Sequence, residues 1–297
     1  MANTESIYSS TLQRLKLKIS DYVMLVKFRL SFIVVFSAGI GYMFGAGDIR
    51  FFSLFLVAGF LITAASNALN QVLEIQTDKL MTRTAKRPLP TGRMTSSEAI
   101  LAAGVMGISG IVLMWIFFNP LAALIGALSL LSYAFVYTPF KKVSPIAVFI
   151  GAFPGAVPPL IGWAAATGSI APIAVLLFSI QFIWQFPHFW AIAWLAHDDY
   201  KSAGFNLLPS PSGKTKSSSI HVVLYSLVLI PVSLIPYFMG YTGIISAIIV
   251  GITGVLFFAQ SIGLHNSCSD KRARQLMFGS FLYLPIVLIT LFADQIY

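Results

Sequence analysis

Long apolar runs alternate with short polar segments along the whole chain. Runs of about 17 to 25 mostly apolar residues have the length that crosses a bilayer as a helix. Nine such runs lie at roughly 26–46, 51–71, 97–117, 121–138, 146–166, 171–195, 220–239, 242–263 and 276–293. We therefore expect an all-α polytopic membrane protein with nine transmembrane helices. Residues 1–20 contain no comparable run and are expected to be a cytoplasmic leader before one transmembrane domain, residues 21–297.

The composition and the placement of basic residues agree with this topology. The chain is 57% hydrophobic and only 10% charged, which excludes an ordinary water-soluble domain. Eighteen of the nineteen Lys and Arg residues lie in segments on one side of the predicted spans, and Arg50 alone lies on the other. The positive-inside rule then predicts a cytoplasmic N-terminus. Topology and anionic lipid account for the net charge of +9, so no nucleic-acid partner is expected.

The end of the second span contains an acidic stripe. Asn70, Glu74 and Asp78 stand at i, i+4 and i+8, which places them on one face of a helix. Two carboxylates so close raise each other's pKa unless a cation lies between them. A basic loop follows at once, containing Arg83, Lys86, Arg87 and Arg93. Acidic residues followed by basic ones suit a divalent metal that carries a phosphorylated ligand.

A second polar cluster follows the sixth span. Asp198, Asp199 and Lys201 come after an even-numbered span, as Asp78 does, so both clusters are expected on a polar rim at the cytoplasmic face. Carboxylates from two helices with nearby Lys and Arg can hold Mg²⁺ and help a diphosphate to leave. With an apolar cavity behind it, such a site suits transfer of a prenyl group from an isoprenoid diphosphate. Asp198 fits either a supporting place beside the metal or a solvated one.

Two other features each have two interpretations, and a third is assigned to structure alone. Lys27 and Arg29 either extend to the lipid headgroups, which we prefer, or help to line a polyanion site. The Gly- and Pro-rich stretch 151–162 indicates a cavity beside the fifth span or close helix packing. Thr95 and Glu98 have the form of a capping box and are assigned to structure.

The two polar clusters resemble a known family. The stripe from Asn70 to Asp78 with the basic loop to Arg93 is similar to the first aspartate-rich motif of the intramembrane aromatic prenyltransferases, the UbiA superfamily. Within it, the chain is most similar to the members that attach a farnesyl group to heme. That closer resemblance rests on Asp21–Arg29, Pro158–Ala164, Trp184–Trp190 and Asp199–Gly204. The chain departs from the family with Glu74 in place of the more usual Asp, Gln71 in place of an acid and Phe28 in place of Pro.

The resemblance implies a helical bundle that encloses a cavity and a specific reaction. A farnesyl group would pass from farnesyl diphosphate to a vinyl group of heme B, and water would add to the resulting cation. Mg²⁺ would be held by Glu74, Asp78 and Asp199, with Asn70 orienting the metal or the diphosphate. The diphosphate candidates are Arg83, Lys86, Arg87 and Lys201. The implied location is the inner membrane, with the active site at the cytoplasmic face and a heme A synthase or a terminal oxidase assembly partner as recipient of the product.

His188 lies between aromatic residues at the end of the sixth span. It either ligates heme iron or pairs with a heme propionate, or it is an interfacial residue whose ring bonds to the backbone. Two rival functions remain for the chain as a whole. One is a prenyltransferase of the same superfamily in quinone biosynthesis. The other is a secondary transporter, which the clustering of acids at one membrane face and the lack of a visible repeat disfavour.

Overall fold

The protein is a bundle of membrane-length helices. The computed structural model describes residues 2–296, with side chains from residue 13 on. Eight segments are long and apolar enough to cross a membrane, and the bent pair 13–25 and 28–44 is the ninth. They are α1 (Ala2–Leu25) with α2 (Phe28–Phe44), α3 (Ile49–Leu73), α5 (Ser96–Phe117), α6 (Pro120–Leu131) with η1 (Ser132–Tyr137) and α7 (Thr138–Phe140), α8 (Ala147–Ala156) with α9 (Pro158–Thr167), α10 (Pro172–Leu195), α12 (Lys216–Phe238), α13 (Ile244–Ser267) and α14 (Asp270–Ala293). The predicted all-α fold is confirmed, and the nine predicted spans agree with the described residues if the bent pair is counted as one span.

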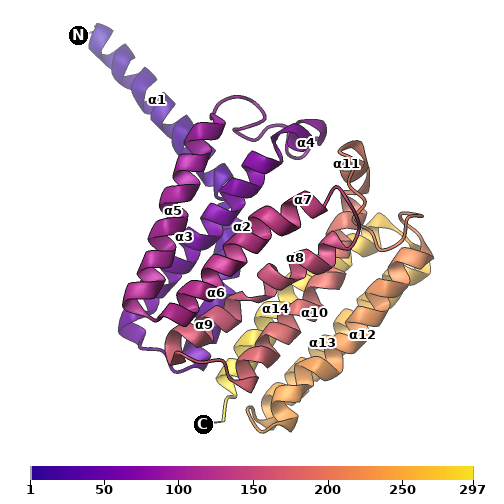
Figure 1. Ribbon diagram of the computed structural model, residues 1–297. Helices are drawn as coiled ribbons and strands as arrows, with labels where there is room; N and C mark the ends of the chain where they lie inside the picture. The colour runs from indigo at the N-terminus through magenta and orange to yellow at the C-terminus, as the bar shows by residue number, and fades with distance from the viewer. Residues whose placement is uncertain (1, 297) are drawn as a thin grey trace.

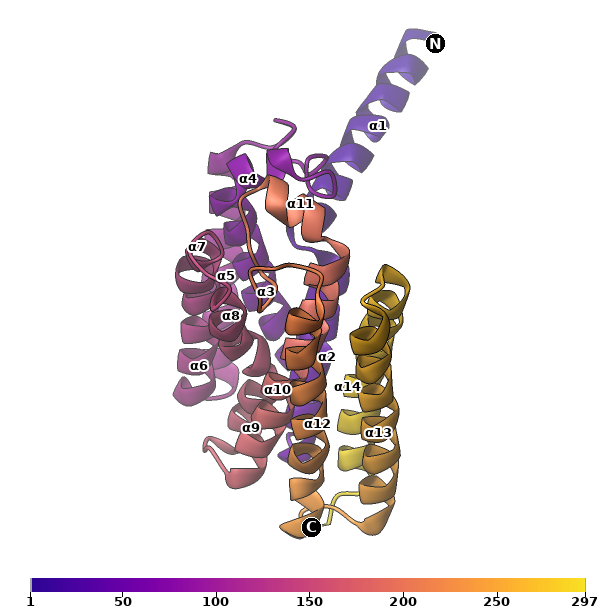
Figure 2. The ribbon, with the colours of Figure 1, turned by 90° about the vertical axis from the view of Figure 1, so that its right-hand side faces the viewer.

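The helices form two groups that pack side by side (Figures 1 and 2). One apolar core joins α2, α3, α6 and α9, and a larger one joins α10, α12, α13 and α14. Within the first group α2 packs closely on α9. Gly162 permits this approach, because a Cβ at that position would collide with the carbonyl oxygen of Ala38. The glycines of this span therefore do serve close packing, one of the two interpretations of its sequence.

The broken span α8–α9 also borders a cavity, which was the other interpretation. Pro154 lies inside α8 and Pro158 begins α9, and both side chains line the cavity together with Gly151 and Gly155. Glycine and proline thus do two things in one span: they admit a neighbouring backbone at one end and leave room at the other.

The N-terminal helix α1 extends beyond the bundle (Figure 2). It runs without interruption from residue 2 to 25, so the predicted boundary at residue 20 falls inside it, and the division into leader and domain stays a prediction. Lys18 of α1 forms an ion pair with Glu98 at 2.7 Å. Thr95 caps α5 by accepting the backbone N–H of Glu98, as predicted, but the Glu98 side chain binds Lys18 and Tyr22 and does not complete a capping box.

Two short helices lie together at one end of the bundle (Figure 1). α4 (Ile75–Leu80) continues from α3, and α11 (His197–Ser202) continues from α10. Both acidic clusters therefore share one end of the bundle, as the even-numbered spans predicted. That this end faces the cytoplasm stays a prediction.

Candidate active site

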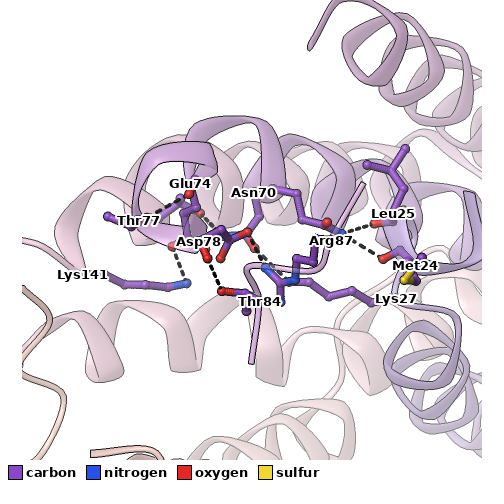
Figure 3. A network of polar contacts seen from close by, with 12 residues as sticks. Met24, Leu25, Lys27, Asn70, Glu74, Thr77, Asp78, Thr84, Arg87 and Lys141 are labelled. Atoms are coloured by element: carbon purple, nitrogen blue, oxygen red, sulfur yellow. Dashed lines mark hydrogen bonds and ion pairs between the residues drawn. The ribbon is translucent and has the colours of Figure 1, made fainter. Parts of the chain in front are cut away.

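The acidic stripe begins where α3 breaks. Glu74 occupies the junction of α3 and α4, yet its N–H still donates to the Asn70 carbonyl at 3.0 Å and its carbonyl accepts from Asp78 at 2.7 Å. The three side chains consequently point to the same side (Figure 3). Asn70, Glu74 and Asp78 are 1%, 5% and 0% exposed. The expectation of a polar rim is therefore wrong for this cluster, which is buried under the loop that follows.

Only one of the two carboxylate oxygens of Asp78 has a hydrogen-bond partner among the described residues. Its Oδ2 accepts a hydrogen bond from Nη1 of Arg87 at 2.7 Å, and Oδ1 is buried with no partner among the described residues. The loop is held in place because the Thr84 hydroxyl donates to the Asp78 carbonyl at 2.9 Å. A buried charge normally has its hydrogen-bonding capacity filled. The bare Oδ1 is thus an acceptor ready for a further cation or donor.

Glu74 pairs with a lysine that the sequence analysis counted only as a topological charge. Lys141 Nζ lies 2.7 Å from Glu74 Oε1, and only 12% of the Lys141 side chain is exposed. Burial alone would raise the pKa of Glu74, but the Lys141 ammonium outweighs it and keeps this pKa below its ordinary value. Lys141 also lies over the Tyr137 ring, 4.7 Å from its centroid. The available signal was the four-residue spacing from Tyr137 to Lys141 at the end of a span that reaches the same membrane face as Glu74.

A second lysine reaches the stripe from the turn between α1 and α2. Lys27 Nζ donates to Oδ1 of Asn70 at 2.8 Å, and Asn70 Nδ2 donates to the Thr138 hydroxyl at 3.1 Å. The preferred interpretation, extension to the headgroups, is therefore wrong for Lys27, while Arg29 is exposed. Lys27 has φ 47°, a left-handed backbone that is uncommon for a residue with a side chain and that occurs mostly at functional sites and turns.

The hydrogen bonds of Gln71 explain why an amide stands at this position. Gln71 Nε2 donates to the carbonyls of Met24 and Leu25, the last residues of α1, at 3.0 and 2.6 Å. Only a donor can satisfy the free carbonyls at a helix C-terminus. An acid at this position would repel them, so the departure from the family pattern fits the local packing.

Asp199, on α11, contacts the loop that follows α4 and lies outside the buried cluster of Asn70, Glu74 and Asp78. Its carboxylate accepts the backbone N–H groups of Thr82 at 3.0 Å and Arg83 at 3.1 Å, and these donors hold the pKa of Asp199 below its usual value. The Arg83 guanidinium lies over the Tyr200 ring at 5.8 Å. Across residues 2–296, no three His, Cys, Asp or Glu side chains converge as a metal group. Glu74 and Asp78 are brought together, and Asp199 is held apart from them.

The remaining predicted residues lie outside the cluster. Lys86, Lys201 and Asp198 are exposed, and within the described chain their side chains form no ion pair or hydrogen bond. Among the four predicted diphosphate residues, only Arg87 reaches the buried carboxylates. Lys141 is the functional candidate that the sequence analysis did not assign, and Lys27 follows the second interpretation given there, the lining of a polyanion site.

A cavity of about 220 Å³ lies inside the bundle. Its wall is apolar for the most part, with polar side chains at Asn67, Tyr133, Tyr137, Gln181, Gln185 and His188. Asn67 precedes Asn70 by one helical turn and Tyr137 contacts Lys141, so the cavity lies next to the charged residues, none of which lines it. The structure thus contains an apolar cavity near the acidic cluster, and a connection between the two stays a prediction.

His188 lies deep in this cavity. Its Nδ1 is 2.7 Å from the Ser280 hydroxyl, and its ring stacks on Trp184 with 4.5 Å between the centroids. The side chain is 8% exposed and bonds to a hydroxyl on α14. The interpretation of His188 as an interfacial residue bonded to the backbone is therefore wrong.

Comparisons with known proteins give a consistent picture. The model of the UbiA prenyltransferase family matches residues 32–284. Two curated proteins named protoheme IX farnesyltransferase are similar. The one from Cytophaga hutchinsonii is 49% identical over 93% of this chain and 98% of its own. The one from Christiangramia forsetii is 42% identical over 93% and 94%. A solved UbiA homolog from Archaeoglobus fulgidus bound to GPP and Mg²⁺ covers 91% of this chain and 99% of its own, with a TM-score of 0.70 and 16% identity, which shows likeness of fold.

Proposed function

The chain belongs to the UbiA prenyltransferase family, and we propose that it transfers a farnesyl group from farnesyl diphosphate to a vinyl group of heme B. Water adds in the same reaction, which gives the hydroxyethylfarnesyl side chain of heme O and releases diphosphate. The observation that carries the proposal is the pair of buried carboxylates, each bound to a cation, next to a cavity inside the bundle. The near full-length similarity to proteins named for this reaction supports the choice of substrates.

The carboxylate end of the site fits Mg²⁺. Asp78 Oδ1 is a buried anionic oxygen without a partner, and Mg²⁺ prefers such oxygens, one or two carboxylates sufficing when phosphates complete its shell. Asp78 and Glu74 would hold the ion, with Asn70 beside them, and Asp199 would join them after release from the backbone of residues 82–83. Bound there, Mg²⁺ would neutralise charge on the departing diphosphate.

The basic residues would bind the diphosphate itself. Arg87 and Lys141 each hold a carboxylate in this structure, and an anion that arrives with a divalent cation gives both residues a new partner. The cations would then contact phosphate oxygens, and the carboxylates would be free for the metal. Lys27 lies next to Asn70 and adds a third, part-buried basic side chain. Arg83, Lys86 and Lys201 are exposed around this end and would draw the anion in by long-range attraction.

The cavity would receive the reacting ends of the two apolar substrates. At about 220 Å³ it is smaller than the roughly 300–1,000 Å³ of pockets that bury a whole drug-sized ligand. The vinyl edge of the heme and the first isoprene unit would therefore occupy it, with the helices moving apart for the remainder. His188 is the candidate for contact with the heme, because it is the imidazole in the cavity wall.

The site would operate at the cytoplasmic face of the inner membrane. The charged residues lie at the end of the bundle that carries eighteen of the nineteen Lys and Arg residues. Since heme O remains an apolar membrane-bound product, a heme A synthase or a terminal oxidase assembly partner in the same membrane would receive it.

The test is to incubate the purified protein in detergent with heme B, farnesyl diphosphate and Mg²⁺ and to analyse the extracted hemes by mass. A product heavier by one farnesyl group and one water supports the proposal. Unmodified heme, together with prenylation of 4-hydroxybenzoate in a parallel incubation, would overturn it in favour of a quinone-pathway enzyme.

A further inference from the structure

The hydrogen bonds around His188 favour one tautomer of its ring. Ser280 donates its single hydroxyl proton to the Met277 carbonyl at 2.6 Å. Its oxygen then accepts from His188 Nδ1, 2.7 Å away, and on this ground we assign the hydrogen to Nδ1 and the lone pair to Nε2. Nε2 has no hydrogen bond in the described part of the chain, and His188 lines the cavity. The protein thus presents a neutral imidazole acceptor to the cavity.

The ring cannot easily turn away from this orientation. Trp184 stacks on it at an interplanar angle of 14°, and Phe281 meets it edge-on with 5.1 Å between centroids. Trp184 is itself anchored, since its Nε1 donates to the Ser280 carbonyl at 3.0 Å. One segment of α14 therefore fixes both rings.

A second acceptor lies one turn before His188 on α10. Gln185 donates through Nε2 to the Ala152 carbonyl at 3.1 Å, which directs its other amide atom, Oε1, toward Gly155. Oε1 has no hydrogen-bond donor among the side chains that the structure describes, residues 13–296, and Gln185 also lines the cavity. Glycine at 155 makes the room, because a Cβ there would collide with Oε1. Gln185 and His188 are three residues apart on α10, and both acceptors belong to residues that line the same cavity.

Gln181, the next polar residue on this face, differs in being engaged. Its Oε1 accepts from the Ser37 hydroxyl, and its Nε2 donates to the Gly155 carbonyl at 2.8 Å. Among the described residues, the structure thus leaves two acceptors of the same cavity wall open, Gln185 Oε1 and His188 Nε2.

We propose that Gln185 and His188 bind the water molecule that is added during farnesyl transfer, and that His188 Nε2 takes its proton. This inference rests on the proposed function. A water that donates one hydrogen to each acceptor keeps a lone pair directed into the cavity, as attack on a cation requires. His188 is then a catalytic residue, and Gln185 is a positioning residue.

The step balances with the substrates already named. The carbon–oxygen bond of farnesyl diphosphate breaks, and its electron pair leaves with the diphosphate. The vinyl π electrons form the new carbon–carbon bond to the farnesyl group, which leaves a cation on the carbon attached to the porphyrin. A lone pair of the water forms the carbon–oxygen bond there, and a water proton passes to His188 Nε2. No oxidant or reductant is needed.

Iron ligation by Nε2 is the competing role. Iron ligation would engage His188 Nε2 alone and would not explain the open Gln185 Oε1. A bound water engages both acceptors. The two roles differ in the product. Without a positioned water, the cation loses a proton to give a farnesylated heme that lacks the hydroxyl group.

The experiment measures the ratio of anhydro to hydroxylated farnesyl heme by mass in H₂¹⁸O. The variants are Gln185→Leu, which removes the acceptor, and Gly155→Ala, which displaces it but keeps both polar groups. We expect each to raise the ratio about tenfold, which corresponds to the loss of one hydrogen bond in the transition state. Gln260→Leu, the same change at a residue of α13 that does not line the cavity, is the control and should keep the wild-type ratio.

Two results would decide against the assignment. A wild-type ratio in the products of both Gln185→Leu and Gly155→Ala would overturn the water site while the farnesyl transfer stands. A His188→Ala product with the wild-type ratio, made by an enzyme whose heme absorption spectrum has shifted, would assign Nε2 to the iron. Absence of any farnesylated heme from the wild-type enzyme would instead overturn the proposed function.

Discussion

Arg87 donates to one carboxylate oxygen of Asp78 at 2.7 Å, and the other oxygen of the same carboxylate is buried without a partner. The ion pair gives this buried carboxylate a counter-ion, without which its burial would be costly. The Oδ1 atom, which has no partner among the described residues, leaves the carboxylate able to bind a further ligand. This combination of one satisfied and one unsatisfied atom is what a ligand-binding carboxylate needs.

Asp78→Asn should abolish turnover and also destabilise the protein. The Asp78 side chain is fully buried and that of Arg87 is 18% exposed, so the change leaves a largely buried guanidinium without its counter-ion. Breaking a buried pair in this way costs about 3 kcal/mol or more. Product formation and thermal unfolding in detergent measure the two effects. Full activity of the variant would remove Asp78 from the metal site.

Exchanging Glu74 and Lys141 should separate folding from catalysis. Each single variant, Glu74→Lys or Lys141→Glu, places two like charges together and should lower the unfolding temperature. The double variant restores an ion pair and should recover most of that loss, yet stay inactive because the carboxylate has moved to another helix. Unfolding scans and turnover of all four proteins test this, and an active double variant would contradict the roles proposed for both residues.

Asp199→Asn and Asp199→Ala should differ if the contact with residues 82–83 matters. Asn keeps an oxygen that can accept from the Thr82 or Arg83 backbone, and Ala keeps none. As a metal ligand, Asp199 would lose its function equally in both. Turnover against Mg²⁺ concentration distinguishes the cases: partial activity in Asn alone indicates a loop contact.

The same contact should depend on pH in the acidic range. Because the folded pKa of Asp199 is lowered, its contribution is complete above the unfolded pKa of about 3.9 and disappears as the pH falls through the lower folded value. Limited proteolysis of the 82–93 loop should therefore be constant between about pH 5 and 8 and increase only in stronger acid. A change in cleavage near neutral pH would point to another group.

His188→Ala should weaken association of heme more than that of farnesyl diphosphate. The imidazole lines the cavity, and the cations proposed to bind the diphosphate lie outside its lining. Separate titrations with heme and with the diphosphate measure the two affinities. Equal weakening of both would remove His188 from direct contact with the heme and would leave the role in binding water, which the product ratio tests separately.

Glu98→Gln should leave turnover unchanged. Glu98 pairs with Lys18 on the exposed part of α1, where the lysine side chain is 44% exposed and solvent screens the pair. Its unfolding temperature should drop less than that of Asp78→Asn. A large loss of activity would mean that α1 contributes to the site.

Hydropathy was sufficient to find the spans, because a helix in lipid must be apolar along its whole length. The helical period likewise placed Asn70, Glu74 and Asp78 on one face, although the backbone breaks at Glu74. Both predictions depend on neighbours in sequence. They needed no knowledge of how the helices pack.

Contacts between residues far apart in the sequence could not be predicted from hydropathy or from the helical period. Glu74 and Lys141 are 67 residues apart, and the positive-inside rule gives every lysine on that face the same explanation. Lys27 was misassigned for this reason. Asp199 shows a further limit, since backbone N–H groups carry no sequence signature and two of them occupy its carboxylate.

The π-helical turn η1, Ser132–Tyr137, has a consequence for comparing related chains. A π turn accommodates one residue more than the α-helical turn it replaces, and it often lies at functional sites. Removing one residue from it would rotate everything beyond by about 100°, which would carry Thr138 and Lys141 away from Asn70 and Glu74. A relative shortened by one residue here would keep every motif in its sequence and still lose the geometry, so gaps in an alignment at this point reveal more than substitutions.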